Sequence, residues 1–448
     1  MTERFDVAIL GAGPGGEHAA SALVDAGWRV LLIERELIGG ECSNWACIPT
    51  KTLLRPAEVR GESARAAGTA EAELDWPELA RYRDYMTSAG DDSARVKGYD
   101  DMGVTVVKGD GRLAGPGRLQ VGDEEFAAEH ILISTGSDPV IPPIDGLRDA
   151  GYWTNREASA LQEIPASAVV IGGGPVGIEL AQFLARFGSR VALAEGADRL
   201  AAREEVEVCA LLRDALESDG IEVHTGVQAT RVRCDGDERV VALSDGTELR
   251  GEQVIVAVGR RPRARDIGLE TIGLGGELRA IPVDEHCRVS DGVWAAGDCT
   301  GVLLFTHVAK YQARVAMADM LGRPVRADYR AIPRVIFSDP ETAAVGLTAA
   351  QARDAGHDVA TAVIDLPQSI ARPYTYEQDP RGRLGVLVDR ERRVLLGAWA
   401  VAPLASEWIH QAVLAIRAQV PLEILLQTVA QFPSYSEGYL SALAQLEL

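Results

Sequence analysis

The stretch GGECSNWACIPTK at residues 39–51 contains two cysteines, Cys42 and Cys47, in a C-x4-C spacing. At this spacing two thiols can close a small disulfide ring that can open again, which suits a redox-active pair beside a cofactor. Two buried structural cysteines would have the same spacing. A zinc half-site is less favoured, because no second Cys/His pair stands at ligand spacing.

A glycine-rich turn lies upstream of the two cysteines. The apolar run at residues 5–10 predicts a buried parallel strand, and it is followed by GAGPGG, an alanine-rich helix and a second strand that ends at an acid. In this order the glycines allow the backbone to approach a pyrophosphate at the helix N-terminus, and the acid can bond ribose hydroxyls. An ordinary βα turn is the alternative. The predicted dinucleotide-binding residues are Gly11, Gly13, Pro14, Gly16 and Glu34.

A second unit of the same kind begins at residues 168–173. It carries the glycines Gly172, Gly174 and Gly177, and its following strand ends at Glu195. Two such units imply two dinucleotide sites. A carboxylate at Glu195 can bond the free ribose hydroxyls of NAD and repels the 2′-phosphate of NADP. We therefore expect NADH at the second site rather than NADPH, although Arg199 lies nearby.

The segment GG-x-C-x-N-x-x-C-I-P-T-K at residues 39–51 resembles the redox-active segment of the pyridine nucleotide–disulfide oxidoreductases, which include dihydrolipoyl dehydrogenase, glutathione reductase and mercuric reductase. The resemblance covers essentially the whole chain. It implies an α/β fold with two doubly wound, Rossmann-like domains for FAD and NAD(P), and a C-terminal α+β dimerisation domain. The predicted segments are 1–148 (first FAD segment), 149–262 (NAD(P) domain), 263–330 (second FAD and central segment) and 331–448 (dimerisation domain).

The same resemblance assigns roles to particular residues. It implies that Cys47 contacts the flavin, that Cys42 faces the substrate, and that Lys51 pairs with Glu179 beside the flavin ring. A surface charge is the alternative for Lys51 and for Glu179. We expect no bound metal. The remaining predicted cofactor-binding residues are Gly40, Gly111, Thr135, Gly136, Gly259, Asp298, at the end of a strand, and Thr306, at the start of a helix where His307 is expected to pack or cap.

Near the C-terminus the chain departs from the family pattern. Disulfide-reducing relatives carry H-P-x-x-x-E, whose histidine is the acid/base for the attacking thiol; here Phe432 takes the histidine position, while Pro433 and Glu437 are kept. Mercuric reductases also lack this histidine, but they end in a cysteine pair, and this chain ends LAQLEL. We expect a cis Phe432–Pro433 peptide bond. Since phenylalanine cannot carry a proton, Tyr435, Tyr439 and Glu437 are the candidate proton donors.

Composition favours a soluble protein that does not bind nucleic acid. Asp and Glu total 66 against 45 Lys and Arg, a formal net charge of −21, which disfavours nucleic acid and anionic membranes. No apolar run approaches the roughly 18 residues of a membrane span. The N-terminal residues lead straight into a predicted strand, so we expect no signal peptide and a cytoplasmic location.

These observations predict a homodimeric FAD enzyme. It would pass electrons from NADH through FAD and the Cys42–Cys47 disulfide to a small-molecule or small-protein disulfide. An NAD(P)H:acceptor reductase acting on a quinone, an electrophilic oxidant or a soft metal ion is the first alternative, because such acceptors need no base. A non-enzymatic redox sensor is the second.

Overall fold

The computed structural model describes residues 3–275 and 278–447, and its contacts divide the chain into two compact units. The first unit consists of Met1–Thr50, Arg81–Val140 and Gly259–Asp328, and the second of Lys51–Ala80, Ile141–Val258 and Tyr329–Leu448. Helices α3 (Cys47–Arg65) and α4 (Trp76–Met86) have residues in both. The predicted segment boundaries stay predictions, because each unit joins several of those segments.

A mostly parallel sheet forms the centre of the first unit. Its strand order is β16-β17-β6-β1-β2-β3, in which all neighbours are parallel except the edge strand β16. The strands are β1 (Glu3–Leu10), β2 (Val30–Glu34), β3 (Thr105–Lys108), β6 (Glu124–Ile133), β16 (Arg288–Ser290) and β17 (Val293–Ala295); β4 (Gly111–Gly115) and β5 (Arg118–Val121) extend β6 as a meander.

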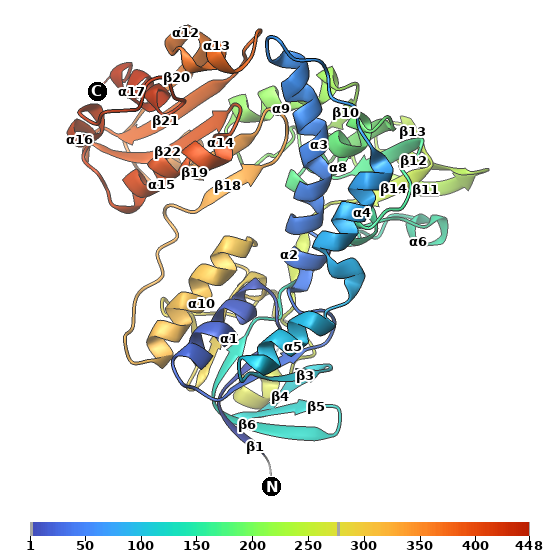
Figure 1. Cartoon of the computed structure of the whole chain (residues 1–448), viewed down its shortest axis with the longest axis vertical. Helices are drawn as coiled ribbons and strands as arrows, with labels where there is room; N and C mark the ends of the chain where they lie inside the picture. Colours follow the sequence, from blue (N-terminus) through green and yellow to red (C-terminus); the bar gives the residue numbers. More distant parts are fainter. Residues whose placement is uncertain (1–2, 276–277, 448) are drawn as a thin grey trace. The chain divides into compact units, whose positions relative to one another are not determined.

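Both faces of this sheet are covered, which explains the apolar runs at residues 7–10 of β1, 30–33 of β2 and 131–133 of β6. Val7 and Ile9 of β1 point to a cluster that includes Ala19 of α1 (Pro14–Asp25) and Ala316 of α10 (Thr306–Met320). The alternate side chains of β1 point to a second cluster on the β4–β5 side. Helices α1 and α10 lie side by side (Figure 1), and α2 (Gly40–Asn44), α5 (Ser93–Asp101), β7 (Ser137–Pro139) and β15 (Arg260–Pro262) complete the unit.

The strand order positions the candidate site. The chain moves from β1 to β2 and β3 on one side, and to β6 and β17 on the other. Ligands of open parallel sheets bind where the order reverses in this way, outside the carboxyl ends of the strands. The carboxyl ends of β1, β2, β6 and β17 meet at that edge. Glu34 ends β2, Gly11 and Thr135 lie in the turns after β1 and β6, and Asp298 lies three residues after β17.

The second unit repeats the nucleotide-type sheet. Strands β10-β9-β8-β14 are all parallel, in the same relative order as β3-β2-β1-β6. These strands are β8 (Ser167–Ile171), β9 (Arg190–Glu195), β10 (Glu222–Thr225) and β14 (Gln253–Val256); helices α8 (Pro175–Arg186) and α9 (Val206–Ser218) follow β8 and β9, and α6 (Leu147–Ala150) and α7 (Asn155–Ser159) precede β8. A separate meander contains β11 (Ala229–Asp235), β12 (Glu238–Leu243) and β13 (Glu248–Gly251).

The C-terminal part of the second unit is an antiparallel sheet with helices, as expected for an α+β domain. Its order is β18-β19-β22-β21-β20, with β18 (Pro333–Ile336), β19 (Thr342–Gly346), β20 (Val359–Asp365), β21 (Arg383–Asp389) and β22 (Val394–Val401). The helices are α11 (Ala349–Asp354), α12 (Leu366–Ser369), α13 (Arg372–Tyr376), α14 (Ala405–Trp408), α15 (His410–Arg417), α16 (Leu422–Leu426) and α17 (Glu437–Ala444).

Helix α16 ends at Leu426, and the residues just after it are exposed; Val429 is 93% exposed. The Phe432–Pro433 peptide bond is cis, as predicted.

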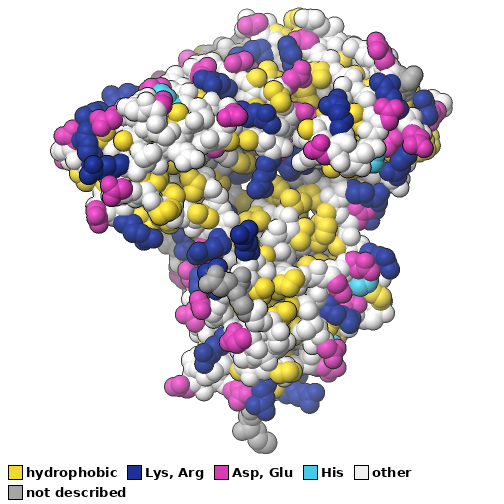
Figure 2. Space-filling model, turned by 180° about the vertical axis from the view of Figure 1, so that it is seen from behind, with side chains coloured by type: hydrophobic (Ala, Val, Ile, Leu, Met, Phe, Trp, Pro, Cys, Tyr) yellow, Lys and Arg dark blue, Asp and Glu magenta, His cyan; other side chains and the backbone are white. Residues whose placement is uncertain are grey.

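The surface is charged without separation of sign on the face seen in Figure 2. Lys and Arg side chains are interspersed there with Asp and Glu side chains. None of the helices among residues 3–275 and 278–447 combines the length and apolar character needed to cross a bilayer.

Candidate functional site

The first glycine turn is closed by tight backbone packing except at one position. Gly11 has φ 103°, and a Cβ there would lie 2.4 Å from the carbonyl oxygen of Ser134. A Cβ on Gly16 would lie 2.0 Å from the oxygen of Gly11, whereas one on Gly13 would meet nothing within 4 Å. Gly13 therefore leaves open space at the N-terminus of α1, where Pro14 begins the helix and first-turn N–H groups lack intrahelical partners. This cradle fits a pyrophosphate.

The two predicted acids are held in the same way in the two units. Glu34 accepts hydrogen bonds from the N–H groups of Ala12 (2.8 Å) and Glu36 (2.7 Å). Glu195 accepts them from Gly173 (2.5 Å) and Ala197 (2.6 Å). In each unit the donors are the residue after the first glycine and the residue two positions after the acid. Carboxylate oxygens keep further lone pairs, so each acid can also accept ribose hydroxyls.

The cysteine segment is attached directly to the first glycine turn. The N–H of Gly39 donates to the oxygen of Ala12 at 2.8 Å, and a Cβ on Gly40 would lie 2.8 Å from the Cα of Gly13. The side chain of Asn44 donates to the oxygens of Gly40 (2.9 Å) and Ile38 (3.2 Å). The two glycines and the asparagine of the stretch thus hold the cysteines against the turn.

Cys42 and Cys47 are both half-buried. Cys42 is in α2, and Cys47 is the first residue of α3. A hydrogen bond between the thiols does most to raise the pKa of Cys42, and burial and the charge of Cys47 raise it further. The Sγ of Cys47 lies 3.5 Å from the Oγ1 of Thr306, the first residue of α10. Cys47 is therefore the sulfur better placed to become a thiolate, because a helix N-terminus favours negative charge.

Asp298 follows a shorter strand than predicted. Strand β17 ends at Ala295, because Gly297, with φ 89°, turns the chain into a 3₁₀ turn that starts at Asp298. The carboxylate of Asp298 accepts a hydrogen bond from Ser137 Oγ (2.6 Å), which in turn accepts one from Arg260 Nε (2.8 Å). Burial raises the pKa of Asp298 in spite of this bond.

Ser137 and Arg260 are candidates that the structure adds to the site. Both lie in crossover segments that the family resemblance implies lead into and out of the second nucleotide domain, residues 131–146 and 254–262. Within these segments β7 pairs with β15. Two crossovers that enter and leave the same domain were the available signal. The pairing itself requires the fold.

The predicted glycines and threonine of these crossovers have structural partners. Thr135 donates its hydroxyl to the oxygen of Arg263 (2.7 Å), and Gly136 accepts from the N–H of Arg263 (2.9 Å). Gly259 accepts from the N–H of Val140 (2.9 Å). Gly111 is the first residue of β4. A Cβ added to it would lie within 2.7 Å of the side chains of Leu10 and Ile33, so a glycine leaves room for both. Their contribution to cofactor binding stays a prediction.

In the second unit the predicted Lys51–Glu179 pair is formed. The Nζ of Lys51 lies 2.6 Å from Glu179 Oε2, and the other carboxylate oxygen accepts the N–H of Phe337 at 3.0 Å. Lys51 lies four residues after Cys47 in α3, and residues at this spacing share a helix face.

The second glycine turn has the features of the first: a Cβ on Gly177 would lie 1.9 Å from the oxygen of Gly172, and one on Gly174 would meet nothing within 4 Å.

The C-terminal candidates for proton transfer are mostly enclosed. Tyr435 and Tyr439 are 5% and 3% exposed, and burial raises the pKa of both. The Tyr435 ring stacks on Trp408 at 5.7 Å. Glu437 accepts the N–H of Ser434 (3.0 Å) at the start of α17, while Phe432 is 66% exposed. A role for these residues in proton transfer stays a prediction.

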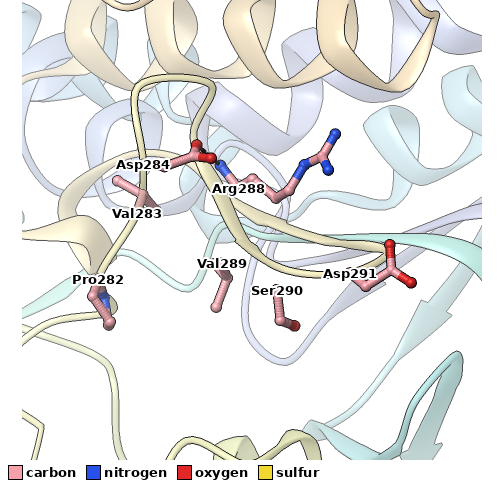
Figure 3. Close-up of a pocket in the computed structure, with 7 residues that line it drawn as sticks. All are labelled: Pro282, Val283, Asp284, Arg288, Val289, Ser290 and Asp291. Carbon is pink, nitrogen blue, oxygen red and sulfur yellow. Dashed lines mark hydrogen bonds between the residues drawn. The ribbon is translucent and has the colours of Figure 1, made fainter.

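A surface hollow of about 450 Å³ lies elsewhere in the first unit (Figure 3). Its lining residues are Pro282, Val283, Asp284, Arg288, Val289, Ser290 and Asp291, none of which is a predicted site residue. Asp284 accepts the N–H of Arg288 at 2.9 Å and is thereby occupied in shaping the loop. Across the described residues, no three His, Cys, Asp or Glu side chains are grouped so that they could hold a metal ion.

Two family models together match most of the chain. The family model "Pyridine nucleotide-disulphide oxidoreductase" matches residues 5–313, and the dimerisation domain of that family matches residues 332–443. The chain is 36% identical over 455 residues to a mercuric reductase from Streptomyces lividans, covering 97% of this chain and 94% of the relative. It is 35% identical over 452 residues to a dihydrolipoyl dehydrogenase from Thermus scotoductus, covering 98% and 96%.

Two solved structures are similar over nearly their full length. The Cu(II) complex of the HOCl-induced flavoprotein disulfide reductase RclA from Escherichia coli has a TM-score of 0.86 at 29% identity, covering 98% of this chain and 99% of that one. LpdA from Mycobacterium tuberculosis has a TM-score of 0.88 at 27% identity, covering 99% of each chain.

The glycine geometry yields a paired prediction. Gly13→Ala should fold normally but bind FAD more weakly, since the new methyl group enters only the open cradle. Gly174→Ala should leave FAD binding unchanged and raise the KM for the nicotinamide nucleotide. Gly16→Ala is the contrasting variant and should lower the thermal unfolding temperature, because its Cβ meets backbone at 2.0 Å. Equal FAD affinity in Gly13→Ala and the unaltered protein would contradict the assignment of the cradle.

Proposed function

The chain belongs to the pyridine nucleotide-disulphide oxidoreductases, and on this premise we propose that it oxidises NADH and delivers the electrons through FAD and the Cys42/Cys47 pair to an acceptor. The observation that carries the proposal is the position of the cysteine segment, which is hydrogen-bonded to the first glycine turn, with Cys47 next to the N-terminus of α10. A nucleotide cradle and a dithiol therefore share one edge of the sheet.

The residues of the first unit fit FAD. The open space at Gly13 and the N-terminus of α1 would receive the pyrophosphate, Glu34 would bond the ribose, and Asp298 would bond the ribitol chain. When bound, FAD takes a hydride from the nicotinamide and passes two electrons to a disulfide. The raised pKa of Asp298 suits this role, because a buried carboxyl group gains from a polar partner such as a sugar hydroxyl.

The chemistry of the thiols follows from their surroundings. In the reduced pair, the sulfur of Cys42 attacks a disulfide of the acceptor, forms a mixed disulfide and releases one thiolate. Cys47 then attacks the Cys42 sulfur, which restores the Cys42–Cys47 disulfide and releases the second thiolate. Cys42 must lose its proton to attack, and its raised pKa makes that loss costly without a base.

For the nucleotide, we propose NADH. Glu195 is fixed at the turn edge of the second sheet by two backbone N–H groups, as Glu34 is in the first. A carboxylate held in this position bonds two free ribose hydroxyls and repels a 2′-phosphate.

For the acceptor, a disulfide is the leading proposal, and an electrophilic oxidant, a soft metal ion or a quinone is the second. The second candidate is supported by Phe432, which occupies the position of the family histidine, and by the burial of Tyr435 and Tyr439. An acceptor without a leaving thiolate needs no proton from this region.

We further propose a homodimer formed through residues 331–448. The dimerisation-domain match covers most of this segment. The segment 331–448 also carries large hydrophobic side chains that are exposed in the single chain, and a partner subunit would cover them. They are Val363, Tyr374, Leu404, Leu414, Ile424, Leu426, Val429 and Phe432.

The cysteine assignment is tested by two serine variants. Reduction by NADH without acceptor should give a long-wavelength absorbance band from the Cys47 thiolate to bound flavin. Cys42→Ser should keep this band, because Cys47 stays unpaired, and Cys47→Ser should lose it. Anaerobic spectroscopy of both proteins with bound FAD measures this. A band retained in Cys47→Ser would reverse the two roles.

The nucleotide preference is tested at Glu195. Glu195→Ala should raise the KM for NADH and reduce discrimination against NADPH. Glu195→Gln is the matched control, since it keeps an oxygen for a backbone N–H but removes the charge; it should reduce discrimination with a smaller rise in the KM for NADH. Steady-state kinetics with both nucleotides measures these effects. If the unaltered enzyme used NADPH about tenfold better than NADH, the carboxylate of Glu195 would not be the group that selects between the two nucleotides.

The missing histidine is tested by supplying it. Lipoamide turnover should be weak in the unaltered enzyme, and Phe432→His should raise it by less than the full acid–base factor of about 10²–10⁴, because the surrounding residues were not shaped around an imidazole. Quinone reduction should change little, and it serves as the control. Both activities are measured across pH. Robust lipoamide turnover with a bell-shaped pH profile in the unaltered enzyme would mean that another group already serves as the base.

A further inference from the structure

Three segments that are distant in the sequence meet at the carboxylate of Glu179. Lys51 of α3 reaches Oε2 at 2.6 Å, and the N–H of Phe337, just after β18, reaches Oε1 at 3.0 Å. Glu179 is only 5% exposed. Both of its oxygens are therefore engaged, one by a side chain and one by the backbone of the C-terminal segment.

Phe337 contacts the other member of the pair as well. The Nζ of Lys51 lies 4.8 Å from the centroid of the Phe337 ring, within the range of a cation–π interaction. The side chain of Lys51 is 34% exposed, and its ammonium group contacts both the ring and the carboxylate. One residue thus fixes Glu179 through its backbone and Lys51 through its ring.

Two residues after Phe337, hydrogen bonds hold both the backbone and the side chain of Asp339. The N–H of Asp339 donates to Gln182 Oε1 at 2.8 Å, and Gln182 Nε2 donates to the oxygen of Asp339 at 3.1 Å. The carboxylate of Asp339 accepts from Arg65 at 3.0 Å and from Arg186 at 2.8 Å. Burial would raise the pKa of Asp339, but the charges of Arg186 and Arg65 outweigh burial and lower it, so these bonds persist through the neutral pH range.

The side chains that hold this backbone have a regular spacing. Glu179, Gln182 and Arg186 stand at positions i, i+3 and i+7 of α8, which places them along one face of the helix. Glu179 accepts a hydrogen bond from Phe337, and Gln182 and Arg186 are both hydrogen-bonded to Asp339. The segment at residues 337–339 is therefore fixed along α8 and cannot slide relative to the Lys51–Glu179 pair.

We propose that Phe337 is a positioning residue for Lys51, with its ring setting the place of the ammonium group that acts at the flavin. This inference rests on the proposed function and on the expectation, implied by the family resemblance, that Lys51 lies beside the flavin. It adds a determinant from the C-terminal segment to a pair formed by α3, the helix that begins at Cys47, and α8.

The test compares two variants of the FAD-bound, full-length protein. Phe337→Leu keeps the backbone N–H and much of the apolar volume but removes the aromatic face, and Phe337→Tyr keeps that face. We expect Phe337→Leu to slow flavin reduction by NADH on the order of threefold to tenfold, and Phe337→Tyr to retain about half of the rate or more. If Phe337→Leu fails to fold, Phe337→Met replaces it, with the same expectation.

A second readout does not depend on activity. The chain has four lysines, Lys51, Lys97, Lys108 and Lys310, so acylation by a succinimidyl acetate reagent can be followed at each by peptide mass spectrometry. Phe337→Leu should raise the acylation rate of Lys51 relative to that of the exposed Lys97, on the order of threefold. Phe337→Tyr should leave this ratio close to that of the unaltered protein. An unchanged ratio in Phe337→Leu would overturn the inference.

A Lys51→Met background separates the inference from the function on which it rests. There, Phe337→Leu should cause no further slowing of flavin reduction, because the group that it positions is gone. The same slowing in both backgrounds would mean that Phe337 acts only structurally, and would overturn the inference. If Lys51→Met alone leaves flavin reduction unchanged, the proposed role of Lys51 fails, and the acylation ratio still decides whether Phe337 restrains the lysine.

Discussion

The attachment of the cysteine segment to the first glycine turn is the constraint on which the candidate site depends. The N–H of Gly39 donates to the oxygen of Ala12, and Gly40 lies so close to the turn that a Cβ on it would be 2.8 Å from the Cα of Gly13. Any side chain at Gly40 would push the segment away from the turn. Because the same turn forms the open space at Gly13, the cysteine segment is held next to that space. This link explains why the cysteine segment at residues 39–51 follows soon after the first glycine turn and β2 in the sequence.

The two nucleotide-type sheets share a second constraint. In each, a carboxylate at the end of the second strand accepts an N–H from the glycine turn and another from the residue two positions further on. These bonds fix the acid before any ligand arrives, so little conformational entropy remains to be lost on binding. The two acids differ in burial, since Glu34 is 8% exposed whereas Glu195 is only partly buried. In the proposed function, the greater exposure of Glu195 suits a nucleotide that is exchanged in each cycle.

The sulfur of Cys47 lies at the N-termini of two helices. Cys47 begins α3 and lies beside the first residue of α10. These surroundings favour a thiolate at Cys47, while the pKa of Cys42 is raised by the hydrogen bond to its neighbour and by burial. The pair is therefore asymmetric in its chemistry. In the proposed function, an acceptor that reacts with Cys42 either brings its own acid–base group or needs no proton transfer. Residue 432 bears on the choice of acceptor because Phe432 cannot supply a proton.

The sequence by itself determined the class of the fold, the two glycine turns with their acids, the cysteine pair, and the departure at Phe432. These features depend on local spacing: a turn before a helix, an acid at a strand end, two thiols within one small ring. The tertiary structure alone decided the pairing of β7 with β15, which brings Arg260 and Ser137 to Asp298, and the convergence of Phe337 on the Lys51–Glu179 pair. Ser137 stands 161 residues from Asp298, and Phe337 stands 158 residues from Glu179. No local pattern encodes such a distance, because it is fixed only when sheets and helices pack.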